Sequence, residues 1–213
     1  QDGQMRDFLY PFVFTLGAGW LLWWPYRHTR QDLRRHEGFL IVAGFWLILS
    51  TVSALPFILG PHLGFFDAFF EAASAFTTTG ATVITGLDNL PKSVLFYRQE
   101  LQWMGGMGII VLAVAVLPLL GMGGMQLYRA ETTGPYKEEK LTPRIAHTAR
   151  SFVLIYLGMT IACAVAYALA GMSVFDAIAH SFSTISTGGF STHDASMSHF
   201  KSVTIELITG FFM

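Results

Sequence analysis

Long apolar segments alternate with short charged segments along this chain of 213 residues. Four stretches contain no Asp, Glu, Lys or Arg, and they cover residues 8–26, 38–66, 101–128 and 151–175. Because an α-helix rises about 1.5 Å per residue, about 20 residues cross the hydrocarbon core of a membrane. The pattern therefore predicts four membrane-spanning helices. A fifth apolar run begins near Val203 and continues to Met213, so we expect the sequence to be a piece of a longer polypeptide.

The composition supports a membrane protein. Hydrophobic residues make up 53% of the chain and charged residues 13%, whereas a soluble domain carries about 25% charged residues. The formal net charge is −1, so the chain has no basic excess for binding nucleic acid. The single cysteine, Cys163, excludes an intramolecular disulfide and a cysteine-based metal site.

The distribution of charge predicts the orientation in the membrane. Nine of the 13 basic residues lie in residues 27–37 and 129–150, which share one side if the spans alternate. The positive-inside bias makes that side cytoplasmic. The opposite side carries an excess of acidic residues, which we interpret as a solvated outer surface that concentrates cations. Its acids from residue 60 onward are Asp67, Glu71, Asp88, Glu100, Asp176, Asp194 and Glu206, against the bases Lys92, Arg98 and Lys201.

An internal repeat appears when the chain is aligned with itself at an offset of 109 residues. Residues 66–82 then match residues 175–191, and both copies begin with Phe-Asp-Ala. Further on, Ser, Thr and Gly coincide at three pairs of positions, which are Ser74 and Ser183, Thr78 and Thr187, and Gly80 and Gly189. Each copy follows one apolar stretch and precedes another, so the repeated unit is span, short apolar segment, polar turn, span.

The short apolar segment of each copy is too short to cross a bilayer and is typical of a re-entrant helix. We expect Asp67 and Asp176 to cap the N-termini of these helices, which then end near Phe76 and Ile185. The negative end of each helix dipole would face the following turn and favour a cation there.

The turns after the short helices consist of neutral oxygen donors and glycine. Their sequences are Thr77-Thr78-Thr79-Gly80 and Ser186-Thr187-Gly188-Gly189. Carbonyl and hydroxyl oxygens that replace the hydration shell of an ion are the basis of potassium selectivity filters. Such a filter needs four loops, so either two copies of this chain associate or two more repeats follow Met213. We favour the second alternative, because the chain stops within an apolar run.

Several segments resemble the membrane subunits of the Trk/Ktr/HKT potassium-uptake superfamily, and the bacterial TrkH family in particular. These segments are FEAASAFTTTGATV (70–83), QWMGGMGIIVLAVAVLPLLGMGGMQLYRAE (102–131), KLTPR (140–144) and STISTGGFS (183–191). The resemblance implies an all-α polytopic membrane protein with four span–pore-loop–span repeats around one potassium pathway, two of which are present here. It implies filter positions at Thr78, Thr79, Gly80, Thr187, Gly188 and Gly189, with Thr77 and Ser186 as neighbours.

The same resemblance implies the cellular setting. It implies potassium as the only bound ion, no organic cofactor, a bacterial inner membrane, a homodimer and a cytoplasmic ring of nucleotide-binding regulatory subunits of the TrkA type. The chain then divides into an extra spanning helix with a basic linker (1–37), the first repeat (38–128), a cytoplasmic loop (129–150) and an incomplete second repeat (151–213). The loop is either a docking face for the ring or a solvated connection.

Other functions remain open from the sequence. A non-conducting assembly or sensor subunit and a sodium-permeable cation transporter are alternatives to potassium uptake. An intramembrane enzyme using Ser183, His193 and Asp194 would leave the duplicated turn unexplained, so we expect no enzyme. We interpret Gly105, Gly106 and Gly108 as a smooth face that packs against a short helix. His180, which replaces Glu71 in the repeat, is interpreted as a structural residue or a residue of the pore mouth rather than as a metal ligand.

Overall fold

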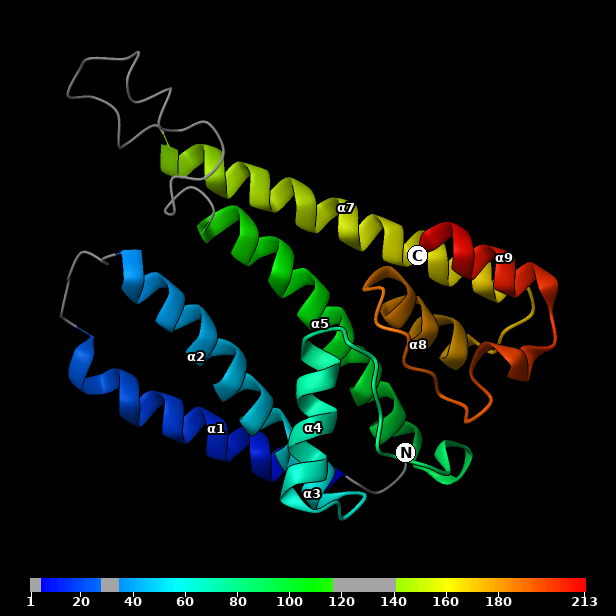
Figure 1. The fold of residues 1–213 in the computed structure, drawn as a ribbon, viewed down its shortest axis with the longest axis horizontal. Helices are drawn as coiled ribbons and strands as arrows, with labels where there is room; N and C mark the ends of the chain where they lie inside the picture. The colour runs from blue at the N-terminus through cyan, green and yellow to red at the C-terminus, as the bar shows by residue number, and fades with distance from the viewer. Residues whose placement is uncertain (1–4, 28–34, 117–140) are drawn as a thin grey trace.

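The computed structural model describes residues 5–27, 35–116 and 141–213, and all regular structure in these ranges is helical (Figure 1). The chain begins with a long helix, α1 (Met5–Tyr26), which exposes apolar side chains along its length. The first repeat contains α2 (Arg35–Ser53), α3 (Leu55–Leu59), α4 (Phe65–Phe76), the 3-10 turn η1 (Leu87–Asn89) and α5 (Lys92–Val116). The second contains α7 (Leu141–Leu169), α8 (Val174–Ile185), the 3-10 turn η2 (Ser196–Phe200) and α9 (Val203–Phe212).

Two helical stretches in the described part of the chain are long and apolar enough to cross a membrane. They are Leu40–Leu59, which runs through α2 and α3, and Thr148–Leu169 in α7. The apolar stretch expected at residues 101–128 continues α5 as far as Val116, and its remainder lies outside the described residues. Helix α7 begins at Leu141, so residues 141–150 of the expected cytoplasmic loop are helical, and residues 129–140 lie outside the described part.

The two repeats place a short helix beside longer ones. Helix α4 contacts α2 and α5, and α8 contacts α5 and α7, so α5 touches both short helices (Figure 1). Helices α4 and α8 each have 12 residues and begin 109 positions apart, at Phe65 and Val174. Their ends at Phe76 and Ile185 confirm the ends expected from the sequence.

The expected caps of the short helices are wrong. Each helix begins three residues earlier than expected, so Asp67 and Asp176 lie in its first turn, and the capping positions are Gly64 and Ser173. Ser173 Oγ accepts a hydrogen bond from the backbone N–H of Asp176 at 3.1 Å and donates to Asp176 Oδ2 at 2.6 Å. An acidic residue at this third position also interacts favourably with the helix dipole, which explains why the aspartates were mistaken for caps.

Glycines on α5 allow this helix to approach the ends of both short helices. A Cβ atom on Gly105 would lie 2.0 Å from the carbonyl oxygen of Phe76, the last residue of α4. A Cβ atom on Gly106 would lie 3.0 Å from Cβ of Ser186, just after α8. The expected packing against the short helices is confirmed for Gly105 and Gly106, whereas Gly108 lies beside the Trp46 ring of α2. Small residues continue the close packing on α4, where Ala68, Ala72 and Ala75 are fully buried.

Candidate functional site

The first polar turn closes α4 with a Schellman motif. The backbone N–H of Thr78 donates to the carbonyl of Ala75 at 3.0 Å, and the N–H of Thr79 donates to the carbonyl of Ser74 at 2.9 Å. This motif needs a left-handed residue after the cap, and Thr78 has φ 55°. A β-branched residue rarely adopts this conformation, for which glycine is the ordinary choice. A strained threonine at this position therefore indicates a functional constraint.

The second turn repeats this geometry at the same offset in the sequence. The N–H of Thr187 donates to the carbonyl of Thr184 at 2.9 Å, and the N–H of Gly188 donates to the carbonyl of Ser183 at 2.8 Å. Thr187 has φ 53°, so the strained threonine recurs as well. The duplication seen in the sequence therefore extends to individual backbone hydrogen bonds.

These hydrogen bonds determine where the carbonyl groups of the turns point. The described peptide bonds are all trans, and in a trans peptide the C=O points opposite to the N–H of the following residue. Because the N–H groups of Thr78 and Thr79 point back to α4, the carbonyls of Thr77 and Thr78 point away from it. By the same reasoning, the carbonyls of Ser186 and Thr187 point away from α8.

Threonine hydroxyls of both turns donate to backbone carbonyls. Thr77 Oγ1 donates to the carbonyl of Ala73 at 2.8 Å and lies 2.7 Å from Thr79 Oγ1. Thr187 Oγ1 donates to the carbonyl of Ser186 at 2.7 Å. A hydroxyl that donates its proton to the backbone keeps its lone pairs as acceptors, and Thr77 uses one of them for the hydroxyl of Thr79.

The two turns meet at their glycines. Gly80 has φ 75°, and a Cβ atom on it would lie 1.9 Å from the carbonyl oxygen of Gly188. Glycine is therefore required at position 80 for two reasons: the positive φ and the close approach of the other turn. Gly189 also has a positive φ, 78°, but no atom lies within 4 Å of its Cβ position. The structure thus brings the predicted residues of both turns together at one place.

Gln102 of α5 holds the second turn from behind. Its Nε2 donates to the carbonyl of Gly188 at 2.9 Å, and its Oε1 accepts from the N–H of Phe190 at 3.2 Å. The carbonyl of Gly188 therefore faces Gln102, whereas the carbonyl of Gly189 points the opposite way. Sequence reasoning missed Gln102, although a buried amide inside an uncharged apolar stretch is a signal for such a role.

A buried ion pair lies behind the first turn, and this corrects the interpretation of two outer charges. Glu71 and Arg98 were expected on a solvated surface, but both are 0% exposed. Arg98 Nη2 lies 2.7 Å from Glu71 Oε1, and Arg98 Nε donates to the same oxygen at 2.8 Å. Glu71 also accepts from Thr82 Oγ1 at 2.9 Å and from the N–H of Val83 at 3.1 Å. The pair thereby ties α4, α5 and the strand-like segment after the first turn together.

The second repeat builds the equivalent contact from neutral groups. His180 occupies the position of Glu71, and Ser191 the position of Thr82. His180 Nε2 lies 3.0 Å from Ser191 Oγ, and its Nδ1 lies 2.9 Å from the carbonyl of Asp176. The Arg98 guanidinium reaches across to this repeat, where Nη1 donates to the carbonyl of Ser191 at 3.3 Å. The structural interpretation of His180 is confirmed by these contacts.

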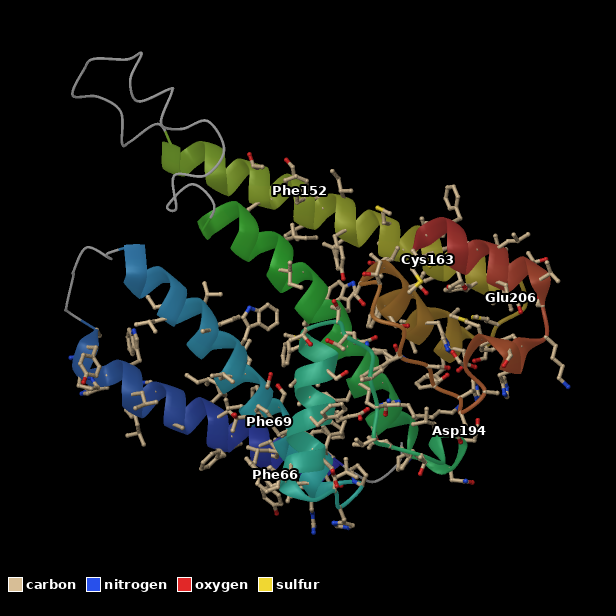
Figure 2. The ribbon with its side chains drawn as sticks, in the orientation of Figure 1. Phe66, Phe69, Phe152, Cys163, Asp194 and Glu206 are labelled. Carbon is tan, nitrogen blue, oxygen red and sulfur yellow. The ribbon has the colours of Figure 1, made fainter. Side chains whose placement is uncertain are left out.

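The linkers that follow the turns are also joined across the repeats. Asp194 Oδ1 accepts hydrogen bonds from the N–H groups of Gly86 and Leu87, both at 3.0 Å. Asp88 Oδ1 lies 2.6 Å from His193 Nδ1, and this hydrogen bond holds the pKa of the Asp88 carboxyl below its usual range. Figure 2 shows Asp194 on the segment between α8 and α9, facing the η1 turn of the first repeat.

The residues of the alternative enzyme site do not assemble. Ser183 is buried and donates to the carbonyl of His180 at 3.2 Å. Asp194 contacts backbone N–H groups of the first repeat, and His193 contacts Asp88, so neither orients the other toward Ser183.

The fold and the turns define a class of protein. Short helices that end in matched turns of neutral oxygens, each flanked by longer apolar helices, are characteristic of pore-loop membrane proteins. The sequence profile of the TrkH family, described as a cation transport protein, matches residues 5–213. The chain belongs to the TrkH family. Membership of this family of transport proteins assigns the chain to a membrane.

Named relatives cover the whole chain. It is 59% identical to the "Trk system potassium uptake protein TrkH" of Vibrio parahaemolyticus and 58% identical to the protein of the same name from Escherichia coli. The chain spans 44% of the length of these relatives. A crystal structure of the potassium transporter TrkH from Vibrio parahaemolyticus matches with a TM-score of 0.86 at 54% identity, covering 100% of this chain and 42% of that one.

Proposed function

We propose that this chain forms the first two pore-loop repeats of a potassium-uptake subunit of the Trk type. The potassium ion is the transported substrate. It is bound by oxygens of Thr78, Thr79 and Gly80 in the first turn and of Thr187 and Gly189 in the second. Gly188, which the sequence predicted as a sixth filter position, instead directs its carbonyl to Gln102 and joins the two turns. Thr77 and Ser186 contribute the carbonyls at the start of each turn.

The observation that carries this proposal is the shared direction of the turn carbonyls. Two Schellman motifs, related by the repeat, direct the carbonyls of Thr77, Thr78, Ser186 and Thr187 away from the helices that precede them. The turns touch at Gly80 and Gly188, so the two sets of carbonyls lie on adjoining turns. Neutral oxygens bind a monovalent cation strongly enough to replace its water and weakly enough to release it.

The helices add to the attraction for a cation. Both α4 and α8 end at the turns, and the C-terminal end of a helix carries a partial negative charge. No carboxylate lies within either turn, so a divalent ion has no charged ligand there. The glutamate nearest the first turn, Glu71, is neutralised by Arg98.

The remaining components of the system follow from the same proposal. Two further repeats of the longer protein complete the ring of four loops. We expect a multi-pass protein of the bacterial inner membrane, in contact with lipid, that forms a homodimer and binds a cytoplasmic nucleotide-binding ring of the TrkA type. The names of the relatives describe a potassium-uptake system, which is the support for a multi-component assembly.

Potassium uptake by glycine variants tests the proposal. A bacterium lacking its own potassium uptake receives the full-length gene as wild type, Gly80→Ser, Gly189→Ser or Gly158→Ser. Rubidium uptake, as a potassium tracer, is measured with and without competing sodium. Gly158 is the matched control, because it lies in α7 with open space around its Cβ position.

The expected result is a loss of potassium-over-sodium selectivity of about tenfold or more in Gly80→Ser, equivalent to about 1.4 kcal/mol of binding. Gly189→Ser should have a smaller effect, since only its backbone conformation is strained. Normal selectivity in both variants would contradict the proposal. Equal sodium and potassium uptake by the wild type would favour the sodium-permeable alternative, and no uptake by any variant at normal protein levels would favour the sensor alternative.

A further inference from the structure

A second group of polar side chains lies outside the turns, where the linkers of the two repeats meet. Asp88 of η1, His193 and His199 of η2 each offer one ligand atom, and these atoms lie within 4.8 Å of one another. Asp88 Oδ1 is 2.6 Å from His193 Nδ1. The rings of His193 and His199 lie parallel, with centroids 3.6 Å apart and an angle of 3° between their planes. We refer to these three residues as the outer cluster.

The Nε2 atom of His193, which faces away from the outer cluster, lies beside the carboxylate of Asp176. His193 Nε2 is buried, makes no hydrogen bond in the described part of the chain, and lies 3.4 Å from Asp176 Oδ1. Asp176 is itself held by Thr192 Oγ1, which donates to Oδ1 at 2.8 Å. In metal sites a ligating histidine almost always directs its other ring nitrogen to a carboxylate or carbonyl, which sets the tautomer and the ring orientation. His193 has this arrangement, with Nδ1 facing the outer cluster and Nε2 facing Asp176.

The outer cluster is accessible to solvent. The Asp88 side chain is 47% exposed and that of His193 is 19% exposed, and His199 is exposed as well. Ligand bonds of about 2.0–2.1 Å around a tetrahedral ion separate neighbouring ligand atoms by about 3.3 Å. An ion lies in the plane of each imidazole that binds it, and the parallel rings of His193 and His199 share no such point in this structure. Binding therefore requires that the exposed side chains of Asp88 and His199 rotate toward His193 Nδ1.

The outer cluster does not derive from the duplicated pore loop. At the offset of 109 residues, His193 and His199 correspond to Ile84 and Leu90, and Asp88 corresponds to Met197. The turn residues therefore match between repeats, whereas the ligand-bearing residues occur in one copy each. The cluster forms only because the two linkers meet in space.

We propose that Asp88, His193 and His199 bind one divalent transition-metal ion of the zinc class at the outer face, with Asp176 as the positioning carboxylate behind His193. Two imidazole nitrogens and one carboxylate oxygen suit Zn²⁺, and water supplies the fourth ligand. The bound ion joins the linker of the first repeat to the linker of the second. This site is independent of the potassium ion bound at the turns.

Zinc titration of the purified protein tests this site. The full-length protein that contains this chain is purified through a tag without histidine, stripped with EDTA and titrated with Zn²⁺ alone by calorimetry and by competition with a fluorescent chelator. We expect one ion per chain, and affinity at least about tenfold weaker in His199→Asn and in Asp88→Asn, a loss of about 1.4 kcal/mol each. His62→Asn is the control, because His62 is an exposed histidine outside the outer cluster.

A second measurement separates metal binding from a structural role of the same residues. Zn²⁺ should raise the unfolding temperature of the wild type and of His62→Asn, but not that of His199→Asn. His199 is exposed, so its replacement leaves the fold intact, which a normal gel-filtration profile and normal rubidium uptake verify. The proposal is overturned if the wild type binds no stoichiometric Zn²⁺ or if the cluster variants bind it as the wild type does. It is also overturned if Asp88→Asn lowers the unfolding temperature equally with and without Zn²⁺. In that case Asp88 stabilises the linkers through its hydrogen bond to His193 and not through a metal ion.

Discussion

Gln102 donates a hydrogen bond from its side-chain amide to the carbonyl oxygen of Gly188 at 2.9 Å, so a helix of the first repeat positions the turn of the second. The same amide accepts from the N–H of Phe190. Two adjacent peptide groups of the second turn are thereby held by one buried side chain. This contact joins the repeats directly at the candidate ion site.

Replacement of Gln102 by leucine should disturb the second turn with little change in packing volume. The variant leaves the carbonyl of Gly188 and the N–H of Phe190 without their partner, at a cost of about 1–3 kcal/mol for each buried group. We expect reduced potassium-over-sodium selectivity, measured as rubidium uptake in competition with sodium.

Gln99→Leu is the matched control for Gln102→Leu. Gln99 lies on the same helix and is also fully buried, but neither of its side-chain polar atoms has a hydrogen-bond partner in the described part of the chain. The same change of shape there should leave selectivity unchanged. Equal selectivity in both variants would contradict the role assigned to Gln102.

Substitution Glu71→Gln should destabilise the protein strongly. It leaves the guanidinium of Arg98 buried without a counter-charge, and breaking a buried pair in this way costs roughly 3–5 kcal/mol. The unfolding temperature in detergent measures the effect, and Asp67→Asn on the exposed side of the same helix is the control. The double variant Glu71→Gln/Arg98→Gln should recover part of the loss, because no isolated charge remains. If the double variant lost more stability than the two single variants lose together, the ion pair would be excluded as the cause.

Substitution Gly105→Ala should prevent the close contact between α5 and the end of α4. The added methyl group would lie 2.0 Å from the backbone carbonyl oxygen of Phe76, which cannot move without unwinding α4. We expect a loss of folded protein, or at least about 1–3 kcal/mol of stability from overpacking. Gly108→Ala is the control, since its methyl group would lie at an ordinary 3.8 Å from the Trp46 ring. Comparable yields of both variants after purification would contradict the prediction.

Removal of the Asp194 carboxylate should loosen the link between the outer linkers. Asp194→Ala deprives the N–H groups of Gly86 and Leu87 of their acceptor, and hydrogen bonds to a charged group contribute about 1.5–3 kcal/mol. Hydrogen exchange at Gly86 and Leu87 should become faster, while exchange within α4 stays the same. Unchanged protection at both amides would indicate that another acceptor holds them.

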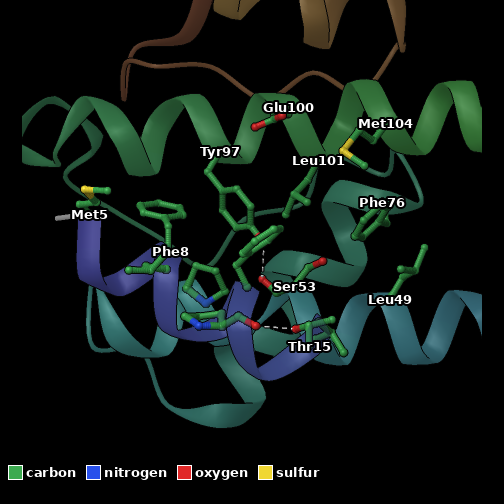
Figure 3. A pocket seen from close by; sticks show the side chains of 15 residues that line it. Met5, Phe8, Thr15, Leu49, Ser53, Phe76, Tyr97, Glu100, Leu101 and Met104 are labelled. Atoms are coloured by element: carbon green, nitrogen blue, oxygen red, sulfur yellow. Dashed lines mark hydrogen bonds between the residues drawn. The ribbon is translucent and has the colours of Figure 1, made fainter. Parts of the chain in front are cut away.

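An apolar cavity lies between α1, α2 and α5 and reaches Phe76, the last residue of α4. It has a volume of about 630 Å³ and includes Phe8, Ser53, Tyr97 and Met104 among its lining residues (Figure 3). Tyr97 donates a hydrogen bond to the carbonyl of Ser53 at 3.1 Å, so its polar group is satisfied there. The lining of the cavity is mostly apolar and comes from α1 on one side and from α2 and α5 on the other.

The sequence by itself determined two of the four predicted spans, the repeat at an offset of 109 residues and the ends of α4 and α8. These features are local, because hydrophobicity over about 20 residues and the turn chemistry of a few neighbouring residues define them. The candidate ion-binding turns belong to this group, and they remain a prediction that the uptake experiment tests. The caps of the short helices were wrong by three residues, since an acidic residue is favourable throughout the first turn.

Only the tertiary structure decided which distant residues support the turns. Glu71 and Arg98 are 27 residues apart, and Gln102 and Gly188 are 86 apart, so no local pattern pairs them. From the sequence, a charged residue near an apolar stretch is equally compatible with a surface charge and with one member of a buried ion pair. Its burial depends on which other elements pack over that residue. The outer cluster of Asp88, His193 and His199 arises in the same way, from two linkers that meet only when both repeats pack against α5.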